Sequence, residues 1–214
     1  MPKTYPISLV LAGKSVLVVG GGEVAARKVK GLLDCEARVT IVSPRLTSEL
    51  EELCLQGECF WLQRAYDKPD LKGAELVFVC TNDEAVNTRI SAEAAEQRLP
   101  VNVADQPDLC SFYLPSVVRR DNLTISVSTS GGSPLSAKLI RKDLESFACK
   151  EIEEYLTLMQ SWRQKVILTL LPAKRKLFWT RVEEEHVYEL MKQGNTRQAQ
   201  AILEQIYNDL ETDN

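Results

Sequence analysis

The sequence is poor in histidine and has no long apolar run. Its 214 residues include one histidine, His186, which excludes a histidine-rich metal site and argues against a histidine-based catalytic triad. No stretch approaches the roughly 18 to 20 apolar residues that a membrane span needs, and the opening residues, MPKTYPISLV, lack the pattern of a signal peptide. We therefore predict a cytoplasmic protein with no membrane partner and no resident metal.

A strong charge of either sign and closely paired cysteines are also missing. Lys and Arg together number 26, and Asp and Glu 30, for a net charge of -4, so the overall charge does not favour nucleic acid as a partner. None of the 6 cysteines forms a CxxC pair, and we interpret them as reduced thiols rather than zinc ligands. The apolar share of 44% suffices for an ordinary buried core.

The first half of the chain alternates short apolar runs with helical patterns. We expect strands at 15–19, 38–42, 59–62, 76–80 and 101–104, and helices at 23–33, from the N-cap Ser48 to about residue 56, and at 84–97. Continuous apolar strands that alternate with helices predict a parallel sheet with both faces covered. The expected fold class is therefore α/β, and it begins with a Rossmann sheet.

The alternation ends after residue 105. Two strands, at 111–118 and 123–129, are expected to form a hairpin outside the parallel sheet, joined by a polar turn at 119–122. Ser133 is a good N-cap, and Pro134 is a good first residue for the helix that follows. These features predict a small mixed α/β segment after the Rossmann sheet.

The remainder of the chain is predicted to be helical. From residue 150 apolar residues recur at helical spacing, and the pattern is broken at Pro172 and again at Gly194. We therefore divide the chain into a Rossmann dinucleotide-binding domain at 1–110, a central segment at 111–149 and an all-helical part at 150–214.

The most informative motif is the glycine-rich junction in VVGGGEVAARK, residues 18–28. A buried strand runs directly into Gly20-x-Gly22-x-x-Ala25, which opens a helix. Gly20 permits the tight turn, Gly22 removes a side chain where a pyrophosphate approaches the backbone, and Ala25 lets the helix pack closely on the strand. Free N–H groups and the positive end of the helix dipole then attract the phosphates. This context indicates a dinucleotide site; the alternative is a glycine-rich turn without a ligand.

The acidic residue that usually follows the second strand is missing. The sequence there reads Ser43-Pro44-Arg45, so Ser43 would supply a hydroxyl or backbone contacts to the ribose, and Arg45 would tolerate a 2′-phosphate. These residues leave the choice between NAD and NADP open. Thr81 and Asn82 follow the strand at 76–80 and are expected to line the cofactor crevice, because ligands bind at the carboxyl ends of parallel strands. An ordinary turn explains them equally well.

Two further features favour a substrate site. Asp105 follows a strand at the same edge as the glycine loop, where its carboxylate would act as a general base or orient a cationic group, unless it is only a turn residue. The segment STSGGSPLSAKLIRK at 128–142 has a capped helix start and several cations, and it suits an anion, although an ordinary helix cap explains it as well. The candidate substrate residues are Ser130, Gly131, Gly132, Ser133, Lys138 and Arg120.

These motifs together resemble a known family. VVGGGEVAARK, CTND at 80–83, VNVAD at 101–105, SFYLPSVV and VSTSGGSPLSAKLIRKDLE occur in the order found in the sirohaem synthase N-terminal family. That family comprises precorrin-2 dehydrogenases, some of which are also sirohydrochlorin ferrochelatases. The resemblance covers residues from about 5 to 148, and the helical tail matches only loosely. No tetrapyrrole methyltransferase domain follows, so the chain resembles the stand-alone form.

The resemblance implies an NAD-dependent enzyme of sirohaem or cobalamin biosynthesis. Precorrin-2, an octacarboxylate tetrapyrrole, would lose a hydride to NAD⁺ and a proton, giving sirohydrochlorin. Asp105 matches the key active-site aspartate of the family, and the dinucleotide contacts match Glu23, Val24, Pro44 and Arg45. The resemblance also implies a homodimer interlocked largely through the central segment.

Two alternatives stay open. The first is a bifunctional dehydrogenase and ferrochelatase: the single histidine indicates no preformed metal site, but the macrocycle supplies its own nitrogen ligands. The second is a dinucleotide-sensing regulatory module. Such modules share the glycine loop, but they usually have an acid after the second strand and lack the SGGSP helix start.

Overall fold

The structure is a computed structural model that describes residues 3–130 and 132–212. The chain forms two compact units, the first ending at Leu114 and the second beginning at Pro115. Within the described ranges, none of the helices has the length and apolar character needed to cross a membrane. The expected finer boundaries at residues 110 and 149 stay predictions.

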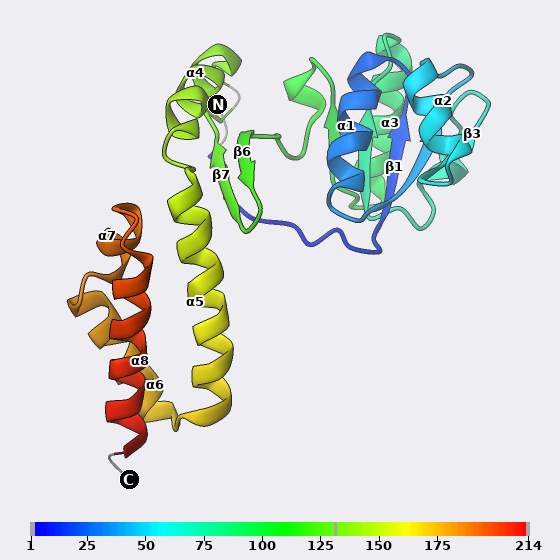
Figure 1. Cartoon of the computed structure of the whole chain (residues 1–214). Helices are drawn as coiled ribbons and strands as arrows, with labels where there is room; N and C mark the ends of the chain where they lie inside the picture. Colours follow the sequence, from blue (N-terminus) through cyan, green and yellow to red (C-terminus); the bar gives the residue numbers. More distant parts are fainter. Residues whose placement is uncertain (1–2, 131, 213–214) are drawn as a thin grey trace. The chain divides into compact units, whose positions relative to one another are not determined.

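A five-stranded parallel sheet forms the centre of the first unit (Figure 1). Its strands are β1 (Ser15–Val19), β2 (Arg38–Val42), β3 (Cys59–Leu62), β4 (Leu76–Val79) and β5 (Val101–Val103). They follow the order β3-β2-β1-β4-β5, which is that of a Rossmann sheet. In the register of β1 with its neighbours, Val19 lies opposite both Val42 and Val79. The predicted α/β fold class with a Rossmann sheet is confirmed.

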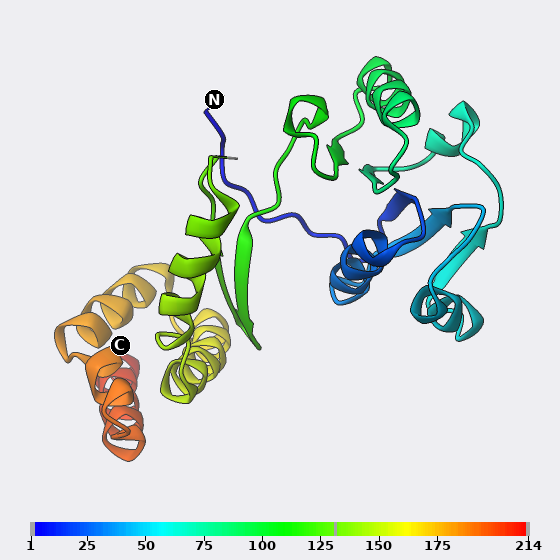
Figure 2. The same ribbon diagram turned by 90° about the horizontal axis from the view of Figure 1, so that it is seen from above.

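Helices cover both faces of this sheet (Figure 2). They are α1 (Glu23–Leu33), α2 (Ser48–Leu55) and α3 (Glu84–Glu96), with the 3-10 turns η1 (Lys68–Leu71) and η2 (Pro107–Leu109). Val16 and Val18 of β1 pack in the cluster that contains α1 and α2, whereas Leu17 and Val19 pack in the cluster that contains α3. Because side chains alternate along a strand and both faces are buried, these strands have continuous apolar sequences.

Several element boundaries in the first unit differ slightly from the sequence expectation; α3, for example, ends at Glu96 and not at residue 97. Thr47, not Ser48, is the N-cap of α2, and its hydroxyl oxygen accepts a hydrogen bond from the Leu50 N–H at 3.5 Å. Both positions offer a hydroxyl, so the sequence alone does not separate them. β4 and β5 each end one residue early, at Val79 and Val103.

The second unit begins with a hairpin and continues as helices. Its elements are β6 (Ser116–Arg120), β7 (Leu123–Val127), α4 (Pro134–Glu145), α5 (Lys150–Thr169), α6 (Pro172–Glu184), α7 (Val187–Lys192) and α8 (Thr196–Thr212). β6 and β7 form their own two-stranded antiparallel sheet, as expected. Pro172 opens α6, and Gly194, with a φ of 78°, follows the end of α7.

The hairpin is shorter and tighter than the sequence suggested. β6 includes Arg119 and Arg120, so the connection is the residue pair Asp121-Asn122, and Asp121 has a positive φ of 34°. A two-residue turn matches the twist of paired strands better than a longer one. The predicted start of this strand at residue 111 was wrong, because the Ser111 N–H donates to the Val101 carbonyl of β5 at 2.8 Å.

Candidate functional site

The predicted cofactor residues and Asp105 follow the carboxyl ends of four parallel strands. These are β1, β2, β4 and β5, and their ends meet at one edge of the sheet. Backbone hydrogen bonds tie the loops to neighbouring strands: the Gly20 N–H donates to the Val42 carbonyl at 2.9 Å, and the Ala104 N–H donates to the Val79 carbonyl at 2.9 Å. The structure therefore brings the glycine loop and Asp105 to the same edge of the unit.

Gly20 and Gly22 have different surroundings in the glycine loop. Gly20 has a φ of 111°, which L side chains rarely adopt, and a Cβ there would lie 2.6 Å from the Cys80 carbonyl oxygen. Gly22 is the N-cap of α1 in an extended conformation, and a Cβ there would meet nothing within 4 Å. The fold itself needs a glycine at position 20, whereas Gly22 faces open space at the start of the helix.

The start of α1 presents backbone donors that the fold leaves available. The N-cap Gly22 has no side chain, and among the described residues no side chain accepts a capping hydrogen bond from the first turn of this helix. Glu23 and Val24 are the first helical residues, and the N–H groups of a first turn have no partner within their own helix. Ala25 is fully buried, so α1 lies close against the sheet. An uncapped helix start with open space before it fits a diphosphate group.

Gly21 also has a structural role, although the glycine motif does not single it out. A Cβ at this position would overlap the Arg45 carbonyl oxygen and lie 2.6 Å from Cδ2 of Leu46. The Gly21 carbonyl accepts a hydrogen bond from the Thr47 N–H at 2.9 Å. The glycine loop therefore packs directly against the loop after β2, and only the run of GGG in the sequence hinted at this.

The hydroxyl of Ser43 is used within its own loop. This side chain is buried, and its Oγ donates to the Arg45 carbonyl at 2.6 Å. The indole N–H of Trp61 donates to the Ser43 carbonyl at 2.9 Å. Pro44 and Arg45 are exposed. The Ser43 hydroxyl thus shapes the loop that follows β2, and the exposed groups of that loop belong to Pro44 and Arg45.

A buried amide connects the residues that follow β4 and β5. Asn87 of α3 is 3% exposed; its Oδ1 accepts from the Thr81 hydroxyl at 2.6 Å, and its Nδ2 donates to the Thr81 carbonyl at 3.2 Å and to Gln106 Oε1 at 3.3 Å. Thr81 is therefore held by Asn87, while Asn82 is exposed. Our sequence reasoning missed Asn87; the available signal was a polar residue in register with Ile90 and Ala94 on the buried face of α3.

Asp105 lies in the turn after β5, with an exposed side chain and a φ of 59°. Aspartate is among the few residues that tolerate this conformation. Burial raises the pKa of the nearby Cys80 thiol to about 11, and the charges of Lys28 and Asp105 act on the same thiol in opposite directions. Cys80 is consequently a neutral thiol near the cations Lys28 and Arg27 and the carboxylate of Asp105.

Of the described substrate residues predicted from the sequence, Ser130, Gly132, Ser133 and Lys138 lie around the start of α4 in the second unit, whereas Arg120 lies in β6. Ser133 is the N-cap, and its hydroxyl oxygen accepts from the Ser136 N–H at 3.2 Å. Oγ1 of Thr129 accepts from the Ser133 N–H at 3.1 Å, and the Gly132 N–H donates to the Thr129 carbonyl at 2.9 Å. Ser130 is half-buried with a φ of 52°, and Gly131 lies outside the described residues. Several donors of this turn are thus satisfied within the turn.

The two predicted cations belong to different elements of the second unit. Lys138 is exposed on α4. Arg120 is the last residue of β6, at the turn end of the hairpin, where its Nε lies 3.9 Å from a carboxylate oxygen of Glu153. The serine-glycine turn follows the opposite end of β7, so the length of the hairpin separates it from Arg120.

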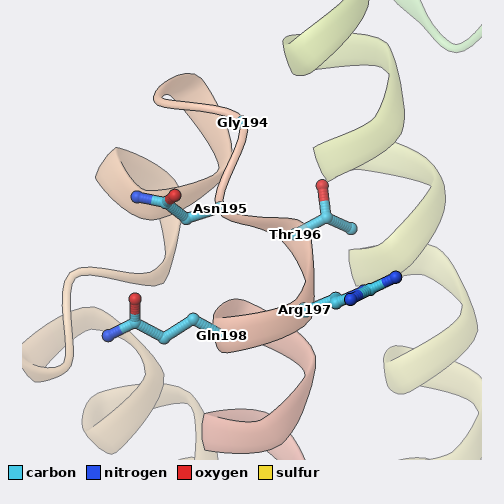
Figure 3. Close-up of a pocket in the computed structure, with 5 residues that line it drawn as sticks. All are labelled: Gly194, Asn195, Thr196, Arg197 and Gln198. Carbon is cyan, nitrogen blue, oxygen red and sulfur yellow. The ribbon is translucent and has the colours of Figure 1, made fainter.

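Two clefts of the second unit contain none of the predicted site residues. One of about 450 Å³ is formed by the turn from α7 into α8, residues Gly194 to Gln198, and Figure 3 shows the side chains around it. The other, of about 920 Å³, is lined by α5, α6 and α7 and includes Tyr155, Trp179 and Tyr188. The first is an ordinary helix connection, and neither cleft is lined by a residue of the glycine loop, so we place the candidate site at the sheet edge.

Comparisons with known families match both units. A family model described as putative NAD(P)-binding matches residues 7–116, and one described as the sirohaem synthase dimerisation region matches residues 154–206. The first of these matches spans more than half of the chain and identifies the sheet edge described above as part of an NAD(P)-binding domain.

Curated relatives and a solved structure extend the match. The chain is 39% identical over 203 residues to a siroheme synthase of Ectopseudomonas mendocina (strain ymp), covering 94% of the chain and 43% of the relative. It is 36% identical over 197 residues to a siroheme synthase of Neisseria meningitidis serogroup C, covering 92% of the chain and 41% of that relative. The chain thus spans about two fifths of the length of these relatives. A solved structure of "SirC, precorrin-2 dehydrogenase" matches with a TM-score of 0.79 and 28% identity, over 96% of this chain and 100% of that one.

Proposed function

The chain belongs to the sirohaem synthase N-terminal family, and from this membership we propose that it is an NAD-dependent precorrin-2 dehydrogenase. The observation that carries the proposal is the likeness to the precorrin-2 dehydrogenase SirC over 96% of this chain and the whole of that one. In the proposed reaction precorrin-2 gives a hydride to NAD⁺ and releases a proton, which yields sirohydrochlorin for sirohaem biosynthesis.

The cofactor part of the proposal uses the residues that follow β1, β2 and β4. The open space at Gly22 and the uncapped start of α1 at Glu23 and Val24 suit the pyrophosphate. When bound, the nicotinamide ring supplies the hydride acceptor. The remaining contacts are assigned to the loops of Ser43, Pro44 and Arg45 and of Thr81 and Asn82. Because Ser43 Oγ already bonds within its loop, we assign its contact to the backbone.

Asp105 is the catalytic residue in this proposal. Its carboxylate is exposed and follows β5 at the edge where β1 leads into the glycine loop. A carboxylate placed there either accepts the proton that the substrate loses or orients the macrocycle for hydride transfer. The substrate's carboxylates are assigned mainly to the charges of Lys138, whose ammonium is exposed, and Arg120. The turn of Ser130, Gly131, Gly132 and Ser133 is assigned a smaller share, because several of its donors are already used within the turn.

We extend the proposal to a homodimer that works in the cytoplasm. The matched dimerisation region supports the dimer, as do the exposed apolar side chains of α4, since contiguous exposed apolar groups mark interaction surfaces. Those side chains are Leu135, Leu139 and Ile140, which are 66%, 52% and 46% exposed. The free thiols of the 6 cysteines suit a reducing compartment.

The test is anaerobic incubation of the purified protein with precorrin-2 and NAD⁺, with NADH formation followed by absorbance. We expect stoichiometric NADH and the spectrum of sirohydrochlorin. Asp105→Ala should lower kcat at least about a hundredfold while NAD⁺ affinity stays unchanged, and Asp108→Ala, in the exposed turn η2, is the matched control. The absence of NADH with the wild-type protein would refute the dehydrogenase, and normal turnover by Asp105→Ala would remove Asp105 from the reaction.

A further inference from the structure

Lys28 is a half-buried cation beside the candidate site that has only uncharged partners. It extends from α1, and its Nζ donates to Asn102 Oδ1 at 3.2 Å and lies 5.3 Å from the centre of the Phe78 ring. Among residues 3–130 and 132–212, no carboxylate oxygen comes within ion-pair distance of this ammonium. Lys30 on the same helix, by contrast, pairs with Glu49.

The amide of Asn102 is fixed so that its oxygen faces Lys28. Asn102 is 7% exposed, and its Nδ2 donates to the Phe112 carbonyl at 3.0 Å and approaches Cys110 Sγ at 3.6 Å. With the amide nitrogen used in this way, Oδ1 is the atom left for the ammonium. An ammonium has three donors, so Asn102 satisfies only one of them and the others remain for a ligand.

The partly buried charge of Lys28 is unfavourable unless an anion lies beside it. Burial lowers the pKa of Lys28, which is the expected effect of removing an ammonium from water without an anion beside it. The titratable groups around it are Arg27 on the same helix, Asp105 after β5, and the thiols Cys80 and Cys110. An apolar side chain of similar length would avoid this cost, so the retained charge points to an anionic ligand.

We propose that Lys28 binds a carboxylate of the substrate next to Asp105. The ammonium lies over the strands that lead to this edge of the sheet: its partner Asn102 belongs to β5, three residues before Asp105, and the Phe78 ring beneath it belongs to β4. Asn102 aligns the ammonium, and the half-buried Phe112, edge-on to Phe78 with ring centres 5.6 Å apart, offers apolar surface beside it. A cation next to apolar surface suits a ring system that carries carboxylates at its rim. The inference rests on the proposed function, which supplies a polycarboxylate tetrapyrrole as the substrate.

The kinetic test uses Lys28→Gln, which keeps a donor for Asn102 and removes the charge. We expect the KM for precorrin-2 to rise about tenfold or more, with kcat and NAD⁺ affinity nearly unchanged. Lys28→Arg keeps the charge and should restore part of the loss. Lys30→Gln is the matched control on the exposed face of the same helix and should leave the KM unchanged. A fall in kcat at constant KM would overturn a role in substrate binding.

An equilibrium test separates this inference from the proposed function. Uroporphyrin III, an octacarboxylate, and coproporphyrin III, a tetracarboxylate, are titrated against the wild-type protein and Lys28→Gln in the presence of NAD⁺, with fluorescence as the readout. We expect Lys28→Gln to lose about tenfold in affinity for uroporphyrin. That loss would support Lys28 as an anion site even if the wild-type protein failed to oxidise precorrin-2. The inference would be overturned if Lys28→Gln bound uroporphyrin III as the wild-type protein does and melted at or above the wild-type temperature, while the wild-type protein oxidised precorrin-2 normally. Lys28 would then be a structural cation.

Discussion

The two glycine-containing strand-to-helix junctions of the chain differ in how their helix starts are satisfied. In the first unit β1 leads into α1, whose N-cap is Gly22 and whose first turn has no side-chain cap among the described residues. In the second unit β7 leads towards α4, whose N-cap Ser133 accepts from the Ser136 N–H, while Thr129 Oγ1 accepts from the Ser133 N–H. The junction before α1 leaves backbone N–H donors for a ligand, whereas the junction before α4 already uses several of its donors in hydrogen bonds within the turn.

This difference decides which junction is the stronger anion site. Both junctions have small residues and a helix dipole, so both are attractive to anions on sequence grounds alone. An N–H group that already donates to a neighbouring hydroxyl gains little from a ligand. Affinity for an anion at the second junction must therefore come mainly from charge, and the exposed Lys138 is the group placed to supply it.

The strongest test of this contrast is Gly22→Asp. A Cβ at this position meets nothing within 4 Å, and the extended backbone of Gly22 suits an aspartate N-cap, so stability should stay equal or rise by a few tenths of a kcal/mol. The new carboxylate would occupy the donors and repel the pyrophosphate, and we expect NAD⁺ affinity to fall about a hundredfold or more. Calorimetric titration with NAD⁺ and thermal unfolding measure the two effects.

Gly22→Ala is the control for this prediction, because it adds bulk without charge or a capping oxygen. It should weaken NAD⁺ binding much less than Gly22→Asp does. If Gly22→Asp bound NAD⁺ as the wild-type protein does, the first junction would not be the phosphate site, and the contrast between the junctions would have no functional meaning.

The next largest effect is expected for Gly21→Ala, which acts on the fold of the first junction. The added methyl group would overlap the Arg45 carbonyl oxygen, and backbone cannot move aside as a flexible side chain can. We expect a loss of about 2 kcal/mol in the free energy of unfolding, measured by urea denaturation, with weaker NAD⁺ binding because the loop must shift.

Gly31→Ala supplies the matched comparison. Gly31 lies within α1, and a Cβ there meets nothing within 4 Å, so the substitution should stabilise the helix by about 0.5 to 1 kcal/mol. If Gly21→Ala and Gly31→Ala changed the free energy of unfolding equally, the glycine loop would not pack closely against the loop after β2.

The sequence specified the first unit well because its signals are local. Strands such as Leu76–Val79 are apolar throughout, which only a sheet buried on both faces requires. The strand-to-helix context of Gly20 and Gly22 predicted the junction for the same reason: the turn, the helix start and the glycines lie within a few residues of one another.

The sequence was less informative where distant residues meet. Gly21 needs to be small because of Arg45, and Asn87 matters because it bonds to both Thr81 and Gln106. Residues 111 to 115 have strand-like sequence, but Ser111 bonds to Val101 instead of extending β6. Such long-range partners have no periodicity or spacing that a single sequence displays.

The smallest expected effect is at the second junction, and Ser133→Ala is the substitution that measures it. The hydroxyl oxygen of Ser133 accepts from the Ser136 N–H at 3.2 Å, and its loss should lower the free energy of unfolding by about 1 kcal/mol, without changing NAD⁺ affinity.

Ser133→Asp keeps a capping oxygen and should keep the stability. If the donors of this turn bound a substrate carboxylate, the added negative charge would also weaken uroporphyrin III binding strongly. Because these donors are already used, we expect Ser133→Asp to lower that affinity only a few-fold through repulsion, and a much larger loss would make the two junctions equivalent anion sites.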